Sequence, residues 1–182
     1  MFFPPPEKLA KLPGKGKIEF QLLYKLGCKV CPLAQLENSN PQMPASGAKQ
    51  PLVYILGEAP GADEDEGGRQ FIGKSGDLLR DRIDAEFSDF KKRIRWNNTV
   101  RTRPWEYRKP SGDPHATERV YNRTPTQIEI ACCRPSVQDD IVASKPKAIF
   151  GFGNIPLHWA TGFSGISAWR GRRMPLKIGS HV

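Results

Sequence analysis

The stretch Leu52-Val53-Tyr54-Ile55-Leu56-Gly57-Glu58-Ala59-Pro60-Gly61 decides the fold. Its first five residues form a continuous apolar run, which is typical of a strand buried on both faces of a parallel sheet. The glycines and the proline end the strand, and a loop rich in glycine and acidic residues follows as far as Gly73. Because open α/β sheets bind ligands at the carboxyl ends of their strands, we expect a functional site in this loop.

Helices and strands alternate on both sides of this stretch. Apolar residues recur every four positions in Ser75–Phe87, which predicts a helix, and another helix is expected at residues 20–27. Further apolar runs predict strands at 94–100 and 148–152, whereas 38–51 are expected to form a loop. Such alternation predicts a three-layer α/β/α sandwich with a small central parallel sheet.

Local signals place the remaining elements. Thr126 and Glu129 form a capping-box pattern that opens a helix, and Pro135 should kink or break that helix. Asn154 is expected to cap a short helix that runs through Ala160.

The length of 182 residues fits one domain, which we place at residues 20–182. Residues 1–19 are rich in proline and lysine and are predicted to be a loose lead-in. Residues 104–124 are polar and lack a period, so we interpret them as a surface insertion.

The chain carries 28 Lys and Arg against 19 Asp and Glu, a net charge of +9. A domain this basic commonly binds a polyanion, although solubility alone would also explain the charge. There is no apolar run of the ~20 residues that a membrane helix needs, and the N-terminus does not resemble a secretory signal. We therefore expect a monomeric cytoplasmic protein that meets nucleic acid. The basic residues form three clusters: Lys91, Lys92, Arg93 and Arg95; Arg101, Arg103, Arg108 and Lys109; and Arg170, Arg172 and Arg173.

Several short motifs follow one another along the chain. Gly57-Glu58-Ala59-Pro60-Gly61, with the acidic residues after it and then Phe71-Ile72-Gly73-Lys74-Ser75-Gly76, resembles the first motif of the family-4, iron–sulfur uracil-DNA glycosylases. Asn98-Thr99-Val100-Arg101-Thr102-Arg103-Pro104 is similar to its Asn-x-Val-x-Cys-Arg-Pro segment. Asn122-Arg123-Thr124-Pro125 and Glu129-Ile130-Ala131-Cys132-Cys133-Arg134-Pro135 match downstream. The resemblance covers about residues 20–180 and implies a DNA-repair enzyme that releases uracil from DNA.

The resemblance also implies roles for individual residues. Phe71 would stack on the flipped uracil, and the amide of Asn98 would match both O4 and N3–H of the base. Glu58 and the backbone of Ala59 would position the attacking water, and Glu64 corresponds to a second acidic position. From the residues alone, Phe71 could instead belong to the core and Asn98 to a turn.

Three further residues open the helix that follows this loop. Lys74, Ser75 and Gly76 lie at its N-terminus, where backbone N–H groups can hold a DNA phosphate. Gly68 to Ser75 also spells the P-loop pattern G-x-x-x-x-G-K-S. A P-loop follows its strand directly, and here a long acidic loop intervenes, so a nucleotide hydrolase is the weaker alternative.

Four cysteines, Cys28, Cys31, Cys132 and Cys133, favour a metal site over disulfides in a reducing compartment. The resemblance implies a [4Fe–4S] cluster with Cys28, Cys31 and Cys133 as three ligands, but Thr102 stands where the fourth cysteine is expected. Cys132 is the remaining thiol, although neighbours on a helix point ~100° apart. A rearranged four-cysteine cluster, a three-cysteine cluster, a zinc site and no metal stay open; we favour an iron–sulfur cluster.

The end of the chain departs from the family pattern. The family carries a His-Pro-Ser motif whose histidine would stabilise the departing uracil anion, but this sequence ends Ser180-His181-Val182. We expect a C-terminally truncated form that lacks the last strand, and neither His115 nor His158 matches the motif. A non-catalytic DNA-binding module that keeps the pocket is therefore the alternative function.

Overall fold

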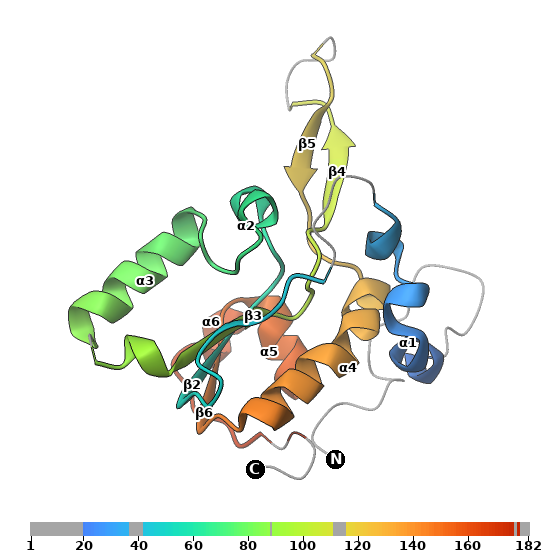
Figure 1. The fold of residues 1–182 in the computed structure, drawn as a ribbon. Helices are drawn as coiled ribbons and strands as arrows, with labels where there is room; N and C mark the ends of the chain where they lie inside the picture. Colours follow the sequence, from blue (N-terminus) through green and yellow to red (C-terminus); the bar gives the residue numbers. More distant parts are fainter. Residues whose placement is uncertain (1–19, 37–41, 88, 111–115, 177, 179–182) are drawn as a thin grey trace.

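A small, mostly parallel sheet forms the centre of the molecule (Figure 1). The computed structural model describes residues 20–36, 42–87, 89–110, 116–176 and 178. The strand order is β1-β3-β2-β6, in which β2, β3 and β6 are parallel and β1 is an antiparallel edge. The strands are β1 (Ser46–Gly47), β2 (Val53–Gly57), β3 (Ile94–Asn98) and β6 (Ala148–Gly151).

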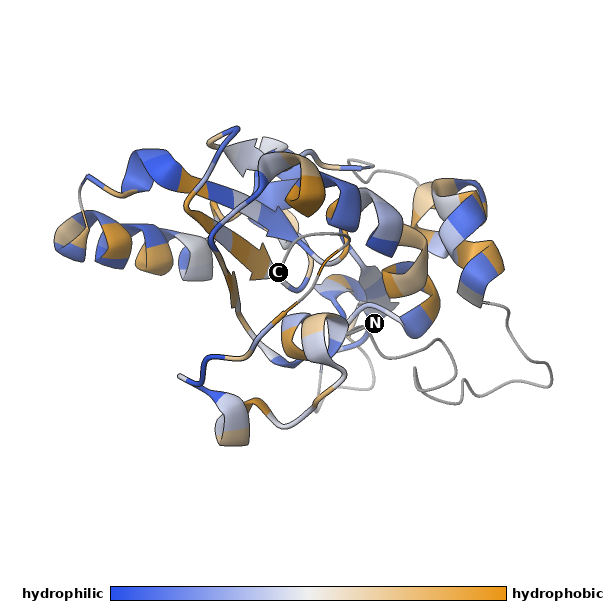
Figure 2. Cartoon of the chain, turned by 90° about the horizontal axis from the view of Figure 1, so that it is seen from below, coloured by the Kyte–Doolittle hydropathy of each residue, from blue (hydrophilic) through white to orange (hydrophobic). Residues whose placement is uncertain are grey.

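Helices cover both faces of this sheet. Successive side chains of β2 point to opposite faces, so each face carries apolar side chains that pack against helices. Val53 and Ile55 pack with β3 residues against α3 (Lys74–Glu86). Tyr54 and Leu56, both fully buried, pack against α4 (Gln127–Ser144) and α5 (Asn154–Thr161). Each such side chain contributes about 1.5–3 kcal/mol by leaving water. The expected three-layer α/β/α sandwich is confirmed, and Figure 2 shows a strongly hydrophobic strand between the helices.

The predicted helix and strand positions hold within a few residues, including α1 (Phe20–Leu26). The loop expected from Gly57 to Gly73 contains a short helix, α2 (Ala62–Gly67). Gly61 caps this helix, and Glu64 accepts a hydrogen bond from its backbone N–H at 3.0 Å. Acidic residues in the first turn of α2 interact favourably with the positive end of the helix dipole. The glycines around them made this segment look like a loop in the sequence.

The structure corrects two local predictions about helices. The capping box of Thr126 and Glu129 opens α4 as expected, but Pro135 lies inside α4 and does not break it, whereas a kink at Pro135 stays a prediction. The burial of α4 against the sheet and α1 offsets the one backbone hydrogen bond that the proline removes. Asn154 is the first residue of α5 rather than its cap, and its Oδ1 accepts a hydrogen bond from the N–H of Ile166 at 2.8 Å.

The predicted surface insertion is an ordered hairpin over most of its length. β4 (Trp105–Arg108) pairs with β5 (Arg119–Asn122) in a separate two-stranded sheet that rises from the body (Figure 1). The aromatic–charged alternation of β4 spans only four residues, too few to stand out in the sequence.

Short helices complete the described chain. They are η2 (Gly27–Lys29), η3 (Pro32–Gln35), η4 (Lys91–Arg93) and α6 (Ile166–Trp169). The lead-in at 1–19, His115 and His181 lie outside the described residues. Within the described ranges, no helix has the length and apolar character needed to cross a membrane.

Candidate functional site

The carboxyl ends of β2 and β3 bring two predicted site residues together. Gly57 of β2 pairs with Asn98 of β3. A Cβ atom on Gly57 would lie 2.1 Å from Oδ1 of Asn98 and 2.7 Å from the ring of Phe71. Only glycine therefore fits at position 57, and the amide of Asn98 and the ring of Phe71 meet over its backbone.

The backbone around Phe71 is held by α3. Phe71 is not glycine yet has a left-handed φ of 55°, and its half-buried ring lies 5.2 Å from that of Trp96. Arg80 donates from Nε to the Phe71 carbonyl at 2.9 Å and stacks over Trp96 at 4.2 Å. A Cβ on Gly76 would lie 2.3 Å from the Phe71 carbonyl, so α3 needs glycine there to approach. Phe71 thus joins the core on one side and the site on the other.

Sequence reasoning missed Gln70, which is fully buried beside Asn98. Nδ2 of Asn98 donates to Oε1 of Gln70, while Nε2 of Gln70 reaches the Met43 carbonyl at 3.5 Å. This contact fixes which edge of the Asn98 amide faces the site. A polar residue in a polar loop gives no sequence signal of burial.

Glu58 follows β2 directly and is half-buried. Burial raises the pKa of its carboxyl group, and a hydrogen bond from the Thr124 side chain opposes that shift. The hydroxyl of Thr99 donates to the Glu58 carbonyl at 2.6 Å, which ties the segment after β3 to the end of β2. A carboxyl group with a raised pKa at the end of a strand is suited to proton transfer.

Glu64 closes the loop between Gly57 and α3. Its Oε2 accepts from the N–H of Gly61 at 3.0 Å, and its Oε1 accepts from the N–H of Gly73 at 3.3 Å. The next two residues, Lys74 and Ser75, lie exposed in the first turn of α3. The carboxylate therefore joins both ends of the loop that carries Phe71.

A buried ion pair fixes Thr124 over the site. The carboxylate of Glu129 is 1% exposed and accepts two hydrogen bonds from Arg123, at 2.9 and 2.6 Å. The N–H of Thr126 donates to the same carboxylate at 2.7 Å. The Asn122–Pro125 motif thereby anchors the hairpin to α4 and holds Thr124 against Glu58.

The four cysteines, which all lie within the described ranges, gather where η2 and η3 meet α4, and none forms a disulfide. The thiols of Cys31 and Cys132 share a hydrogen bond, and burial together with the neighbouring thiols raises the pKa of Cys132 to about 12. Burial also raises the pKa of Cys133 to about 12, although its sulfur accepts from the Arg101 N–H. Thr102, the next residue, is buried and accepts from the Gln42 N–H at 3.1 Å. As placed, however, no three His, Cys, Asp or Glu side chains of the described residues are arranged to hold a metal ion.

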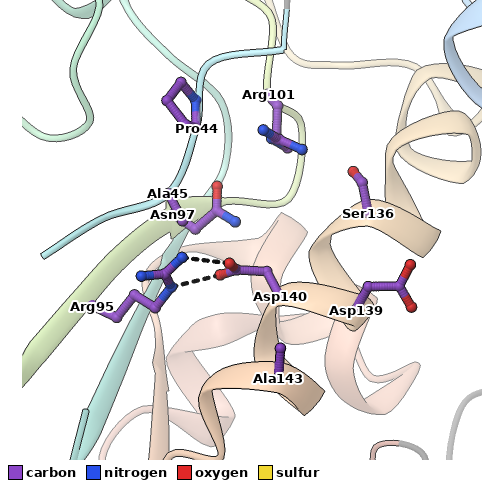
Figure 3. A pocket seen from close by; sticks show the side chains of 9 residues that line it. All are labelled: Pro44, Ala45, Arg95, Asn97, Arg101, Ser136, Asp139, Asp140 and Ala143. Carbon is purple, nitrogen blue, oxygen red and sulfur yellow. Dashed lines mark hydrogen bonds and ion pairs between the residues drawn. The ribbon is translucent and has the colours of Figure 1, made fainter. Parts of the chain in front are cut away.

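A cavity of ≈ 350 Å³ lies on the other side of β3, between that strand and α4 (Figure 3). Arg95 and Asp140 form an ion pair at 2.5 Å in its wall, and Asn97 points toward the same side. Burial alone would raise the pKa of Asp140, but hydrogen bonds from Arg95 and Tyr54 outweigh it and lower the pKa. Because Asn97 and Asn98 face opposite sides of β3, this cavity is separate from the site at Phe71.

Comparisons with known proteins show which family the chain belongs to. A model of the uracil DNA glycosylase superfamily matches residues 44–179, which include the site and the hairpin. The chain belongs to the uracil DNA glycosylase superfamily.

Within the superfamily, the chain is similar to several type-4 uracil-DNA glycosylases. The chain is 32% identical over 140 residues to a type-4 uracil-DNA glycosylase of Pyrobaculum aerophilum, covering 76% of this chain and 62% of the relative. It is 30% identical over 128 residues to that of Sulfurisphaera tokodaii, covering 70% and 50%. The match to the Thermotoga maritima protein is 28% over 149 residues, covering 82% and 68%. The matches thus span 50% to 68% of the length of these relatives.

The fold does not favour the P-loop alternative. α2 lies between the end of β2 and the Gly68–Ser75 pattern, whereas a P-loop connects its strand directly to its helix.

Proposed function

We propose that this chain removes uracil from DNA by hydrolysing the bond between the base and its sugar. The meeting of Phe71 and Asn98 over Gly57, the residue that directly precedes the half-buried Glu58, is the observation that carries the proposal. Superfamily membership and the similarity to type-4 uracil-DNA glycosylases support it.

Recognition of the base rests on two groups. The ring of Phe71 stacks on a base that has left the duplex, which recovers about 1–3 kcal/mol of the unstacking cost. Asn98 gives one amide hydrogen to Gln70. The second hydrogen and Oδ1 then match O4 and N3–H of uracil, whereas cytosine presents the reverse pattern. Gln70 acts as a positioning residue for this amide.

Bond cleavage rests on the end of β2. The ionised carboxylate of Glu58 stabilises the positive charge that builds up on the sugar as the bond to the base breaks and uracil leaves as its anion. Glu58 then accepts a proton from the water that adds to the sugar carbon, and the Ala59 backbone helps to position this water. The raised pKa of Glu58 makes it a stronger base than an exposed glutamate. Glu64 supports the reaction by holding the loop through Gly61 and Gly73.

DNA outside the pocket is held by positive charge. Lys74 and Ser75 are exposed at the start of α3, and with Gly76 they can hold a phosphate through the helix N-terminus and the ammonium group. The net charge of +9 implies an affinity for DNA that falls steeply with salt.

We also propose an iron–sulfur cluster, [4Fe–4S], on Cys28, Cys31, Cys132 and Cys133. The four thiols lie within electrostatic reach of one another, and Cys132 is hydrogen-bonded to Cys31. The donor set fits the group in kind and number, although the side chains must turn toward a common centre. A cluster there would cross-link the N-terminal helices to α4, so its role would be structural.

Iron content tests the choice of ligands. Protein purified without oxygen should be brown, and Cys132→Ser should lose iron. In Thr102→Cys, which restores the family's fourth cysteine, iron should no longer depend on Cys132. Stoichiometric zinc in a colourless wild type would contradict the cluster.

The proposed activity also bears on the domain extent, the oligomeric state and the location of the protein. We place residues 20–182 in one domain that works as a cytoplasmic monomer, where cysteines stay reduced and DNA is accessible. Sedimentation of the purified chain with and without oligonucleotide tests the monomer.

Uracil release tests the proposed activity. The 182-residue chain should release free uracil from a uracil-containing oligonucleotide and leave a matched thymine oligonucleotide intact. Phe71→Ala should slow release by about 5- to 150-fold, the equivalent of one lost stacking contact. Tight binding of uracil-containing DNA without release would favour the non-catalytic module.

A further inference from the structure

The hairpin of β4 and β5 has two chemically different faces. Its register pairs Trp105 with Asn122 and Tyr107 with Val120. Because side chains alternate along a strand and paired residues share a face, these four side chains lie on one face. We refer to Trp105, Tyr107 and Val120 as the aromatic face. The opposite face carries Glu106, Arg108, Arg119 and Tyr121.

The aromatic face is open to solvent. The side chain of Tyr107 is 62% exposed and that of Val120 is 42% exposed. The rings of Trp105 and Tyr107 meet edge to face, with centroids 5.1 Å apart. This contact holds the ring of Tyr107 in place while leaving its surface available. A preordered, exposed aromatic ring is the element on which unpaired bases stack in proteins that bind single strands.

The base of the aromatic face adjoins the proposed base pocket. Asn122 lies on this face, and its Nδ2 is 3.5 Å from the position that a Cβ of Gly61 would occupy. Its Oδ1 accepts from Nε of Arg103 at 2.7 Å. Two residues later, Thr124 bonds the carboxyl group of Glu58. A DNA strand that leaves the base pocket and runs along the hairpin would therefore contact Arg103 first and the aromatic face next.

We propose that the aromatic face is a stacking platform for unpaired bases of single-stranded DNA that flanks the target nucleotide. The proposal rests on the proposed function for the place of the target base. Charge complementarity selects this occupant, because Arg103 lies against Asn122 at the base of the aromatic face and Lys109 follows β4 directly. Arg108 and Arg119, on the opposite face, add to the positive charge of the hairpin. The face extends the path of the strand beyond the pocket and gives the enzyme a preference for single-stranded or locally opened DNA.

Binding of the full chain to a labelled oligothymidine without uracil tests the platform. Tyr107→Ala should weaken this binding by about 5- to 150-fold, whereas Tyr107→Phe, which keeps the ring, should bind like the wild type. One control variant should also bind like the wild type: Phe87→Ala removes the ring of a residue that is 61% exposed at the C-terminal end of α3 and does not belong to the aromatic face.

A blunt duplex of the same length separates stacking from phosphate contact. Its bases are already stacked, so Tyr107→Ala should leave duplex affinity unchanged. Unchanged oligothymidine affinity in Tyr107→Ala, or an equal loss for duplex and single strand, would overturn the platform. A dimer in solution that Tyr107→Ala dissociates, with DNA affinity unchanged, would show that the face joins two copies and would also overturn it.

The proposed function can fail independently of the platform. Loss of oligothymidine binding in Tyr107→Ala, together with a wild type that releases no uracil, would contradict the activity and support the platform. Uracil release by the wild type, together with unchanged oligothymidine binding in Tyr107→Ala, would support the proposed activity and contradict the platform.

Discussion

Replacing Asn98 by aspartate should change which base the site accepts. The substitution keeps the shape of the side chain and removes its hydrogen-bond donor. Gln70 can rotate its amide so that Nε2 donates to the new carboxylate. The rotation replaces the 3.5 Å contact of Nε2 with the Met43 carbonyl by Oε1, but that carbonyl keeps its hydrogen bond from Nε of Arg101. The fold should therefore survive. Uracil O4 would then face an acceptor, at a cost of about 1–3 kcal/mol. Excision of uracil should slow by about 5- to 150-fold, while the N4 amino group of cytosine gains an acceptor.

Asn97→Asp is the matched control for this substitution. Asn97 is the preceding residue on β3 and is equally buried, but its Nδ2 donates to the Tyr54 hydroxyl on the opposite side of the sheet. This variant should lower stability and leave the preference for uracil unchanged. Single-turnover excision from oligonucleotides with one uracil or one cytosine, next to thermal unfolding, measures both effects. Wild-type preference in Asn98→Asp would refute the assignment of Asn98 as the residue that reads the base.

Three further predictions concern stability and pH. Arg123→Ala should lower the free energy of unfolding by about 3–5 kcal/mol, because it removes the cation and both of its hydrogen bonds from the buried carboxylate of Glu129, which then keeps the hydrogen bond from the N–H of Thr126. A loss below about 1 kcal/mol in urea denaturation would show that the pair is dispensable. Glu58→Gln should stabilise the fold at neutral pH, because the pKa of Glu58 is raised in the folded protein and wild-type stability therefore falls as pH rises through that pKa. The gain in stability from Glu58→Gln should vanish below the ordinary pKa of glutamate. A difference in melting temperature that does not change with pH would contradict this prediction. Uracil release by the wild type should increase as pH rises through the same raised pKa, and a flat pH–rate profile would show that another group acts as the base.

The sequence predicts the framework of this fold well because its signals are local and strong. The apolar run before Gly57 marks the central strand, and the fourfold repeat in Ser75–Phe87 marks the helix on one face. Pro135 shows the limit of such signals. Tertiary packing around α4 overrides the helix-breaking tendency of one residue, and a single sequence does not reveal that packing.

The site was predictable only in part. Glu58, Phe71 and Asn98 belong to motifs that resemble one family, and the structure brings Phe71 and Asn98 into contact distance over Gly57. The positioning partner Gln70 and the clamp made by Glu64 depend on where side chains point after folding, which neither spacing nor composition indicates. The hairpin was missed as a structure because two short alternating segments, 10 residues apart, look like a polar loop.

Release of free uracil tests the central claim most directly. The chain should be incubated with a single-stranded oligonucleotide that carries one labelled uracil, with Phe71→Ala and Glu58→Gln alongside. We expect free uracil and an abasic product with the wild type, a slower reaction with Phe71→Ala, and little product with Glu58→Gln. An intact oligonucleotide after prolonged incubation with folded wild-type protein, or equal rates for all three, would contradict it.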